Sequence, residues 1–315
     1  MRFAKGHGTG NDFVILPDPD GQLELSARVV ARICDRHAGL GGDGVLRVVR
    51  SEAAGAQADD WARRAAERGA EWFMDYRNAD GSIAEMCGNG IRVFTRYLLD
   101  NGLATGPELA IGTRAGVRVV REALDGRLTV DMGPARVTGR GSVLLGDREV
   151  SGLGVSVGNP HLACVVDDPV AGYDLSVPPV LTGGDFPDGA NVEIVRLADD
   201  GRAEMRVYER GSGVTLSCGT GAVAAAVAAA VTAGEWLNGA ERTWTVDVPG
   251  GRLAVTPGGT ASLLSGPAVI VATGELDDRW LGEATRAAGA AGAAGTAGTA
   301  GGAAGRRSAA VSAIG

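Results

Sequence analysis

Several residue types that support large classes of protein chemistry are scarce in this chain. Its 315 residues include three histidines, four cysteines and one lysine, Lys5. The cysteines stand at positions 34, 87, 164 and 218, and no two of them form a Cys-x-x-Cys pair. Too few ligands remain for a zinc site, so we expect no bound metal. With one lysine in the chain, no candidate presents itself for binding pyridoxal phosphate, and we expect no cofactor.

Positive charge and long apolar runs are also scarce. The formal net charge is −8 and the pI is near 5.0, so the chain has no electrostatic footprint for nucleic acid. No basic cluster predicts binding to a membrane surface, and no apolar run approaches the ~20 residues that span a bilayer. The first residues, MRFAKGHGTGND, lack the order of a secretory signal. We therefore expect a cytoplasmic protein with reduced thiols and a small-molecule partner.

The residues that are present predict two similar halves. Hydrophobic residues make up 45% of the chain, which is enough for a sizeable core. We predict an N-terminal half over residues 1–135 and a C-terminal half over residues 136–282. In each half, strand-like runs precede a helix that follows a cysteine, and further strands come after it. The second helix, GAVAAAVAAAVTAG, is apolar all round, which predicts a buried helix with a sheet wrapped around it.

Two segments differ in composition from the rest. Residues 51–71 are rich in alanine, arginine and acidic residues, and we interpret them as a solvated surface insertion. Residues 283–315 form a low-complexity tail composed mainly of alanine and glycine. Such a composition cannot bury a core, so the tail is predicted to be disordered.

Two short motifs carry the chemistry. EMCGNGIR, residues 85–92, and LSCGTGAV, residues 216–223, each place a cysteine directly before Gly-x-Gly at a predicted helix start. The first turn of a helix has unpaired N–H groups and the positive end of the macrodipole, so it can hold an anion beside the sulfur. The same field favours thiolate, and we expect the pKa to fall from about 8.5 toward neutrality. Two such corners predict opposed thiols, which suit proton exchange at a stereocentre.

Other uses of glycine-rich turns do not fit their context. GHGTGND is followed by the strand-like FVIL rather than by a helix, which argues against a dinucleotide-binding fingerprint. No Gly-Lys-Ser/Thr phosphate loop occurs in the chain. Nucleophilic acyl transfer would need only one of the two thiols.

Over residues 1 to about 280 the chain resembles diaminopimelate epimerase, in the ordered motifs HGTGNDF, DRHAGLGGDG, NADGSIAEMCGNG, GNPH, NVE and ERGSGVTLSCGTG. The resemblance implies an α+β fold of two pseudo-symmetric halves, each a mostly antiparallel sheet wrapped around a central helix. It implies a cofactor-independent epimerase that interconverts LL-2,6-diaminopimelate and the meso form, in lysine and peptidoglycan precursor biosynthesis. It also implies a homodimer.

The same resemblance assigns roles to individual residues. Cys87 and Cys218 would be the acid/base thiols, one charged and one protonated, with His161 and Glu209 orienting the reacting amine and tuning the thiols. The reacting carboxylate would be held by backbone N–H groups of the two helix starts, at Gly88, Asn89, Gly219 and Thr220. The distal carboxylate and amine would be gripped by Asn11, Asn78, Asn159, Asn191, Glu209 and Arg210. The remaining cysteines, Cys34 and Cys164, have no glycine corner and are predicted to be buried.

Departures and alternatives stay open at this point. Val214 stands where many family members have glutamate, and Gly44 stands where some have a substrate-contacting glutamine. A proline-racemase-like enzyme is one alternative, although Asn89 and Arg210 argue against it. A non-catalytic amino-acid-binding protein of the same fold is another, against which both cysteines argue. A third is a redox-active pair in which Cys87 and Cys218 close into a disulfide. We predict that oxidation would join the two thiols and stop activity as a side effect of their proximity.

Overall fold

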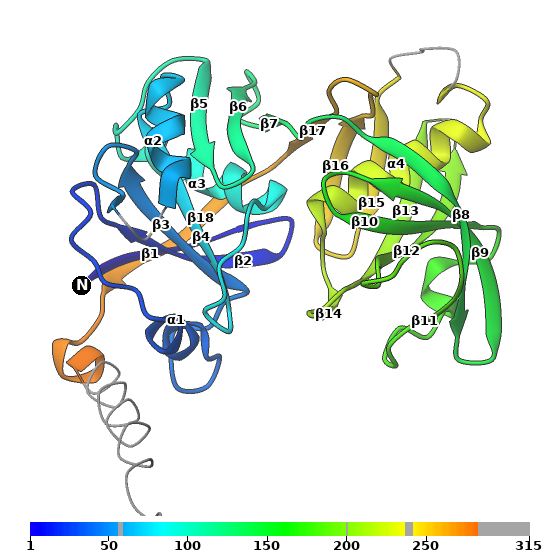
Figure 1. The fold of residues 1–315 in the computed structure, drawn as a ribbon, viewed down its shortest axis with the longest axis horizontal. Helices are drawn as coiled ribbons and strands as arrows, with labels where there is room; N and C mark the ends of the chain where they lie inside the picture. Colours follow the sequence, from blue (N-terminus) through cyan, green and yellow to red (C-terminus); the bar gives the residue numbers. More distant parts are fainter. Residues whose placement is uncertain (56–58, 200, 237–241, 283–315) are drawn as a thin grey trace, which may run out of the picture.

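The computed structural model describes residues 1–55, 59–199, 201–236 and 242–282, which form two lobes side by side (Figure 1). One mixed sheet of 18 strands runs through both lobes of this described part of the chain. The predicted disordered tail, residues 283–315, lies outside the described residues. No helix among the described residues is long and apolar enough to cross a membrane.

The first lobe is a sheet around one central helix, α3 (Gly88–Asp100), with further helices outside it. Its outer helices are α1 (Ala27–Cys34) and α2 (Asp59–Glu67). Its strands are β1 (Arg2–Gly8), β2 (Asn11–Pro17), β3 (Gly44–Arg50), β4 (Trp72–Asn78), β5 (Glu108–Thr113), β6 (Gly116–Glu122), β7 (Leu128–Asp131) and β18 (Val269–Glu275).

The second lobe repeats this plan around α4 (Gly219–Thr232), with a 3₁₀ turn, η2 (Val170–Gly172), outside the sheet. Its strands are β8 (Arg136–Leu145), β9 (Arg148–Ser156), β10 (Pro160–Val166), β11 (Val180–Gly183), β12 (Asn191–Asp199), β13 (Arg202–Glu209), β14 (Gly213–Thr215), β15 (Trp244–Val248), β16 (Gly251–Thr256) and β17 (Leu263–Gly266). The fold class predicted from the sequence is confirmed.

The strand pairing shows the duplication directly. In the first lobe β2–β3 and β4–β5 are parallel and β3–β4 is antiparallel. In the second lobe β10–β12 and β13–β15 are parallel and β12–β13 is antiparallel. Each central helix lies in the connection between the third and fourth of these strands, which are parallel, as a crossover between parallel strands requires.

The chain returns to the first lobe at its end. β17 pairs with β7, and β18 then lies antiparallel to β1 (Figure 1). β18 thus covers the edge of β1 in the way that β8 covers the edge of β9, since an uncovered edge presents unpaired backbone groups. The sequence boundary instead grouped β18 with residues 136–282. We propose a division that assigns β18 to the first lobe, because strand pairing rather than sequence order closes that sheet.

The two central helices bury side chains of different size. Helix α4 is built of alanine and valine, and every residue from Gly221 to Ala230 is buried, as the sequence predicted. Helix α3 buries larger side chains, among them Ile91, Phe94 and Leu98. One apolar cluster includes residues of both helices, so the core is continuous from lobe to lobe.

The segment 51–71 is not only a solvated insertion. Its helix α2 buries Ala62 and Ala65 in a small apolar cluster with Phe73 of β4. An amphipathic helix can cover the outer face of a sheet with very small residues, which is why its composition suggested a wet surface.

Candidate active site

The first corner is the start of α3, where Cys87 is the N-cap residue. Cys87 has extended backbone angles (φ −136°, ψ 124°), and its Sγ accepts a hydrogen bond from Gly90 N at 3.4 Å. The sulfur thereby takes the place of the oxygen that usually caps a helix start. Gly88 and Asn89, the next two residues, are buried in the first turn.

The second corner has the same local geometry at the start of α4. Cys218 is the N-cap residue (φ −116°, ψ 122°), and its Sγ accepts from Gly221 N at 3.4 Å. The Thr220 hydroxyl lies 3.5 Å from Cys218 Sγ. As residues, Cys218 is buried and Cys87 is half-buried.

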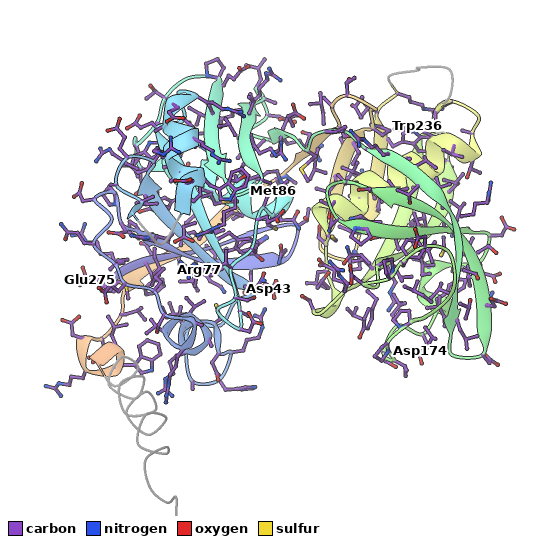
Figure 2. The ribbon with its side chains drawn as sticks, viewed as in Figure 1. Asp43, Arg77, Met86, Asp174, Trp236 and Glu275 are labelled. Carbon is purple, nitrogen blue, oxygen red and sulfur yellow. The ribbon has the colours of Figure 1, made fainter. Side chains whose placement is uncertain are left out.

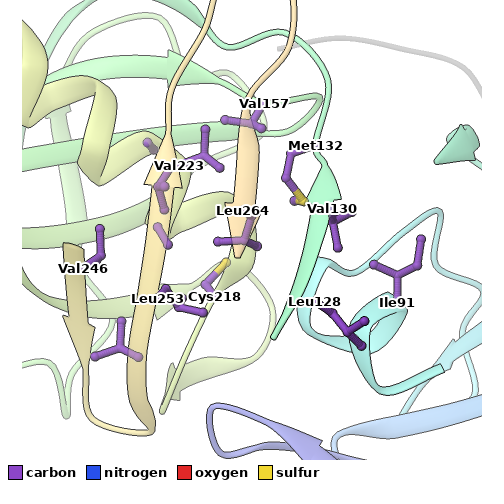
Figure 3. Packing of buried hydrophobic residues seen from close by; sticks show 14 of the residues in the cluster. Ile91, Leu128, Val130, Met132, Val157, Cys218, Val223, Val246, Leu253 and Leu264 are labelled. Atoms are coloured by element: carbon purple, nitrogen blue, oxygen red, sulfur yellow. The ribbon is translucent and has the colours of Figure 1, made fainter. Parts of the chain in front are cut away.

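The two corners meet. A Cβ on Gly219 would lie 3.1 Å from Gly88 Cα and 3.5 Å from Asn89 N, so the two helix starts approach closely at these glycines. Asn89 Nδ2 also donates to the carbonyl oxygen of Ser217 at 3.0 Å, which ties the first corner to the residue before Cys218. Figure 3 shows Cys218 beside Leu253 and Leu264 in the packed layer that continues toward the first lobe.

Equivalent positions in the two lobes can be read from the strand registers. Gly44 lies opposite both Phe13 and Asn78, and in the second lobe Asn191 lies opposite His161 at the same place. Val192 pairs with Tyr208, so Asn191 and Glu209 end their strands side by side. Cys87 follows Asn78 by nine residues, and Cys218 follows Glu209 by nine. The pairs Gly44/Asn191, Asn78/Glu209 and Cys87/Cys218 are therefore pseudo-symmetric.

Asn11 lies against the first corner. Its Oδ1 accepts from Cys87 Sγ at 3.6 Å and from Asn89 Nδ2 at 3.3 Å, and its Nδ2 donates to Asp43 Oδ2 at 2.6 Å. Asp43 also binds Arg36 through its other oxygen at 2.8 Å. Figure 2 shows Asp43 on the side of the first lobe that faces the second. Sequence reasoning missed Asp43, although it stands in the quoted motif GGDG.

His161 and Asn159 form a chain of contacts that reaches the second corner. His161 Nε2 lies 3.0 Å from Asn159 Oδ1, and Asn159 Nδ2 donates to Thr220 Oγ1 at 3.3 Å. On its other side, His161 Nδ1 lies 2.7 Å from Glu193 Oε1, and both side chains are fully buried. Sequence reasoning missed Glu193, whose signal was one carboxylate within the apolar strand run NVEIVRL.

Glu209, Asn191 and Arg210 stand at the ends of adjacent strands. Glu209 Oε1 accepts from Thr215 Oγ1 at 2.5 Å, and burial raises the pKa of its carboxyl group above the usual value. Asn191 Oδ1 accepts from the backbone N–H of Arg210 at 2.9 Å. The guanidinium of Arg210 is exposed and donates to the carbonyl oxygen of Asp188 at 2.9 Å.

Asn78 is placed differently from the other predicted site residues. Its Nδ2 donates to Ser82 Oγ at 3.0 Å, within the turn that follows β4. Among the described residues no hydrogen bond links Asn78 or the Arg210 guanidinium to either cysteine. Both nevertheless stand at the strand ends nearest the corners, through the registers given above.

Burial dominates the ionisation of both corner thiols. It raises the pKa of Cys87 to about 11, although the N–H groups of Gly90 and Asn89 lower it. The expectation of a pKa near neutrality is therefore wrong for Cys87. A helix start stabilises a thiolate, but here loss of solvation costs more than the first-turn N–H groups return.

The second thiol is affected more strongly. Burial raises the pKa of Cys218 well above its usual value, and the carboxylates of Glu209 and Glu193 raise it further. The two cysteines outside the corners, Cys34 and Cys164, are buried as predicted, and burial raises the pKa of each to about 12.

The chain is similar to known epimerases over most of its length. A family model described as "Diaminopimelate epimerase" matches residues 3–138 and 154–275, which include both cysteine corners. The diaminopimelate epimerase of Thermobifida fusca is 59% identical over 276 residues, covering 88% of this chain and 98% of that relative. The diaminopimelate epimerase of Mycobacterium tuberculosis (strain H37Rv) is 50% identical over 288 residues, covering 89% of this chain and 98% of that relative.

Solved structures share the fold at low sequence identity. A phenazine biosynthesis protein of the PhzF family from Bacillus anthracis is 16% identical with a TM-score of 0.64, covering 88% of this chain and 99% of that one. A hydroxyproline epimerase from Agrobacterium vitis is 14% identical with a TM-score of 0.59, covering 90% and 94%. At such identity these similarities show the two-lobed fold alone.

Proposed function

The chain belongs to the diaminopimelate epimerase family, and we propose that it interconverts LL-2,6-diaminopimelate and meso-diaminopimelate. The observation that carries the proposal is the contact between two cysteine-capped helix starts at Gly88 and Gly219. Inversion at a carbon needs one proton acceptor and one proton donor on opposite faces, and two such corners supply both.

In the proposed reaction, Cys87 and Cys218 exchange roles in each turnover. A thiolate removes the α-hydrogen as a proton, the C–H electron pair stays on the substrate as a carbanion, and the opposite thiol donates its proton to the other face. The first sulfur ends as a thiol and the second as a thiolate. The α-ammonium of a bound substrate would bring a positive charge beside the sulfurs, which favours the thiolate that burial otherwise disfavours.

The reacting carboxylate would lie between the two helix starts. There the N–H groups of Gly88 and Asn89 on one side, and of Gly219 and Thr220 on the other, belong to the first turns and have no carbonyl acceptor in a preceding turn of the helix. As the carbanion forms, negative charge spreads onto this carboxylate, and donors already in place stabilise it. The glycines support the proposal because they allow the ligand to approach the backbone.

The residues at the strand ends would hold the rest of the substrate. His161, through Asn159, would orient the corner of Cys218, and Glu209 would accept from the reacting ammonium and tune the thiol. The distal carboxylate suits the fork of Arg210, which is exposed and bound to one carbonyl oxygen. Polar amides would complete the grip: Asn11, Asn78, Asn159 and Asn191.

We also propose that the enzyme acts without a cofactor, as a homodimer in the cytoplasm. Two catalytic thiols have to stay reduced, and a reducing compartment meets that need. Light scattering of the purified protein would give the mass in solution, and a single 31.9 kDa species would contradict the dimer.

The proposal is tested by incubating the reduced protein with LL-diaminopimelate in heavy water, without added cofactor. We expect the meso isomer to form with deuterium at the inverted α-carbon, since the entering proton comes from an exchangeable thiol. Proline and hydroxyproline serve as parallel substrates, because a proline-racemase-like enzyme would invert those instead. The proposal would be rejected if diaminopimelate showed no inversion and no deuterium exchange.

A further inference from the structure

Arg92, on the second turn of α3, is fully buried and has no acidic partner. Its Nη1 donates to Gly88 O at 3.1 Å, its Nη2 to Asn89 Oδ1 at 2.8 Å, and its Nε to Pro267 O at 3.5 Å. All three acceptors are neutral oxygens. No ion pair joins Arg92 to a carboxylate within the part of the chain that the structure describes. A buried cation without a counter-ion is unfavourable, so it needs a reason at this position.

The surroundings of Arg92 are built to keep the guanidinium in place. A Cβ on Gly8 would lie 3.1 Å from Arg92 Nη2, and a Cβ on Gly266 would lie 3.3 Å from its Cζ. The guanidinium therefore fits between two glycines, at the ends of β1 and β17. A side chain at either position would crowd the guanidinium, so both glycines leave room for it.

The contacts of Arg92 run directly to the first corner. Gly88 and Asn89 are the residues whose N–H groups would bind the reacting carboxylate, and Arg92 holds one by its carbonyl oxygen and the other by its side chain. Asn89 in turn bonds to Asn11 and Ser217. The guanidinium thus fixes the orientation of an amide that links both corners.

The charge of Arg92 also acts on Cys87. Burial lowers the pKa of Arg92 to about 10, which still leaves it protonated near neutral pH, and Cys87 raises that pKa. Conversely, Glu209, which faces Cys87 from β13, raises the pKa of Cys87, and Arg92 lowers it. Tyr76, on β4, is the other titratable group affected by Cys87, and burial raises the pKa of Tyr76 well above its usual value, so it stays neutral.

We propose that Arg92 is a positioning residue of the Cys87 corner, which orients Gly88 and Asn89 and supplies the positive charge balanced by the Cys87 thiolate and the substrate carboxylate. The role of Arg92 toward the substrate carboxylate rests on the proposed function. Its role toward the Cys87 thiolate does not. The second corner has no counterpart, since Val223 stands five residues after Cys218 where Arg92 stands five after Cys87. The positive charge is therefore specific to one of two otherwise similar helix starts.

The test measures the reactivity of Cys87 without substrate. In a Cys218→Ala background, with Arg92→Gln added, the rate of alkylation of Cys87 by iodoacetamide at pH 8 is followed by peptide mass spectrometry. Each unit of increase in the thiol pKa lowers the thiolate fraction about tenfold and raises the nucleophilicity of the thiolate about threefold. We therefore expect alkylation to be roughly threefold slower for each unit by which the pKa of Cys87 rises. Because no substrate is involved, this result stands even if the protein proves inactive with diaminopimelate.

Arg96→Gln is the matched control. Arg96 lies on the same helix but pairs with Asp100 and Glu122, so its loss removes an arginine and its ion pairs without touching the corner. We expect Cys87 alkylation to be unchanged in this variant. A folded Arg92→Gln protein, judged by circular dichroism, that alkylates Cys87 as fast as the control would overturn the role of the charge.

Arg92→Lys separates charge from geometry and decides the case if Arg92→Gln does not fold. Lysine keeps the charge but cannot hold Gly88 and Asn89 together, because it lacks the planar fork. We expect near-normal Cys87 alkylation with a KM for diaminopimelate raised roughly fivefold, as for one weakened hydrogen bond, and a smaller change in kcat. Slow alkylation in the lysine variant, or an unchanged KM, would contradict the proposal.

Discussion

The two cysteine corners share a backbone but not an electrostatic environment. At the first, Gly90 packs against Phe13 and Leu46, and the buried charge is Arg92. At the second, Gly221 packs against Glu193, which binds His161. The strand registers make these neighbours equivalent, since Phe13 and His161 occupy the same place in their lobes. A duplicated scaffold has thus placed a cation beside one thiol and a carboxylate beside the other.

The difference makes the two thiols unequal before any substrate binds. At the first corner Glu209 raises the pKa of Cys87 and Arg92 lowers it, whereas at the second corner two carboxylates, Glu209 and Glu193, both add to the effect of burial on Cys218. Cys87 is therefore the thiol that ionises more readily. Such inequality suits a reaction whose two substrates are not mirror images, because LL and meso isomers present different distal centres to the same grip.

Loss of either corner thiol should have the largest effect. Cys87→Ala and Cys218→Ala each remove one member of the acid/base pair, and we expect epimerisation to fall by at least 10²–10⁴-fold, roughly the contribution of one acid/base group. Circular dichroism at a fixed wavelength follows conversion between the isomers. Cys164→Ala, a buried cysteine with no corner, is the control and should retain activity; a slow control would point to folding rather than chemistry.

Glu209→Gln should affect the second corner in the direction opposite to Arg92→Gln at the first. Removing this carboxylate lowers the pKa of Cys218, so in a Cys87→Ala background Cys218 should be alkylated several-fold faster at pH 8. Epimerisation in the otherwise native chain should fall roughly tenfold or more, as the ammonium partner is lost. Glu204→Gln, at a half-buried residue of the same strand, is the control. Equal rates of Cys218 alkylation in the Glu209→Gln and Glu204→Gln variants would contradict the difference between the two corners.

Glu193 in the second lobe and Leu46 in the first occupy equivalent positions. The Glu193→Leu variant therefore gives the second corner the residue type found at the first. His161 Nδ1 would then be buried without an acceptor, and we expect a loss of about 1–3 kcal/mol in the free energy of unfolding. Urea denaturation with Glu193→Gln as the control measures this, since the amide oxygen of glutamine can still accept from Nδ1–H. Stability equal in the two variants would show that the buried hydrogen bond is unimportant.

Alkaline pH should give the smallest of these effects. Each corner thiol has a folded pKa above the ordinary value of 9.0, so the unfolded chain loses its protons first and stability falls as pH rises above 9. The contribution is fully present below pH 9 and is lost as pH approaches the folded value, by at most ~1.4 kcal/mol per pH unit and thiol. The slope between pH 9.5 and 10.5 should be shallower in Cys218→Ala than in the native chain, and an unchanged slope would contradict the buried thiol.

Much of the fold was accessible to sequence reasoning because its signals are local. The all-apolar helix after Cys218, the helix after Cys87 and the strands on either side follow from short-range periodicity and glycine placement. The place of β18 was not accessible, since its pairing with β1 joins residues at opposite ends of the chain. The segment that contains α2 was predicted to be a solvated insertion because alanine buries little area and its composition resembles that of a surface segment.

The residues of the candidate site also divide into those that local motifs indicate and those that only tertiary contacts identify. Motifs identified the cysteines and their glycines, and the structure brings these together, but Arg92, Asp43 and Glu193 gave no signal as strong. Their importance lies in what they contact, and those partners come from other strands. The roles assigned to Asn78 and Arg210 stay predictions, since no contact among the described residues joins them to the thiols.

By itself, the sequence determined that two cysteines cap two helices, because a helix start and its glycines are set by neighbouring residues, and it predicted proton exchange as the chemistry. Only the tertiary structure decided that the helix starts touch, that burial outweighs the helix field on each thiol, and that one corner has a cation and the other carboxylates. Those outcomes depend on desolvation and on charges from distant strands, which act through space rather than along the chain.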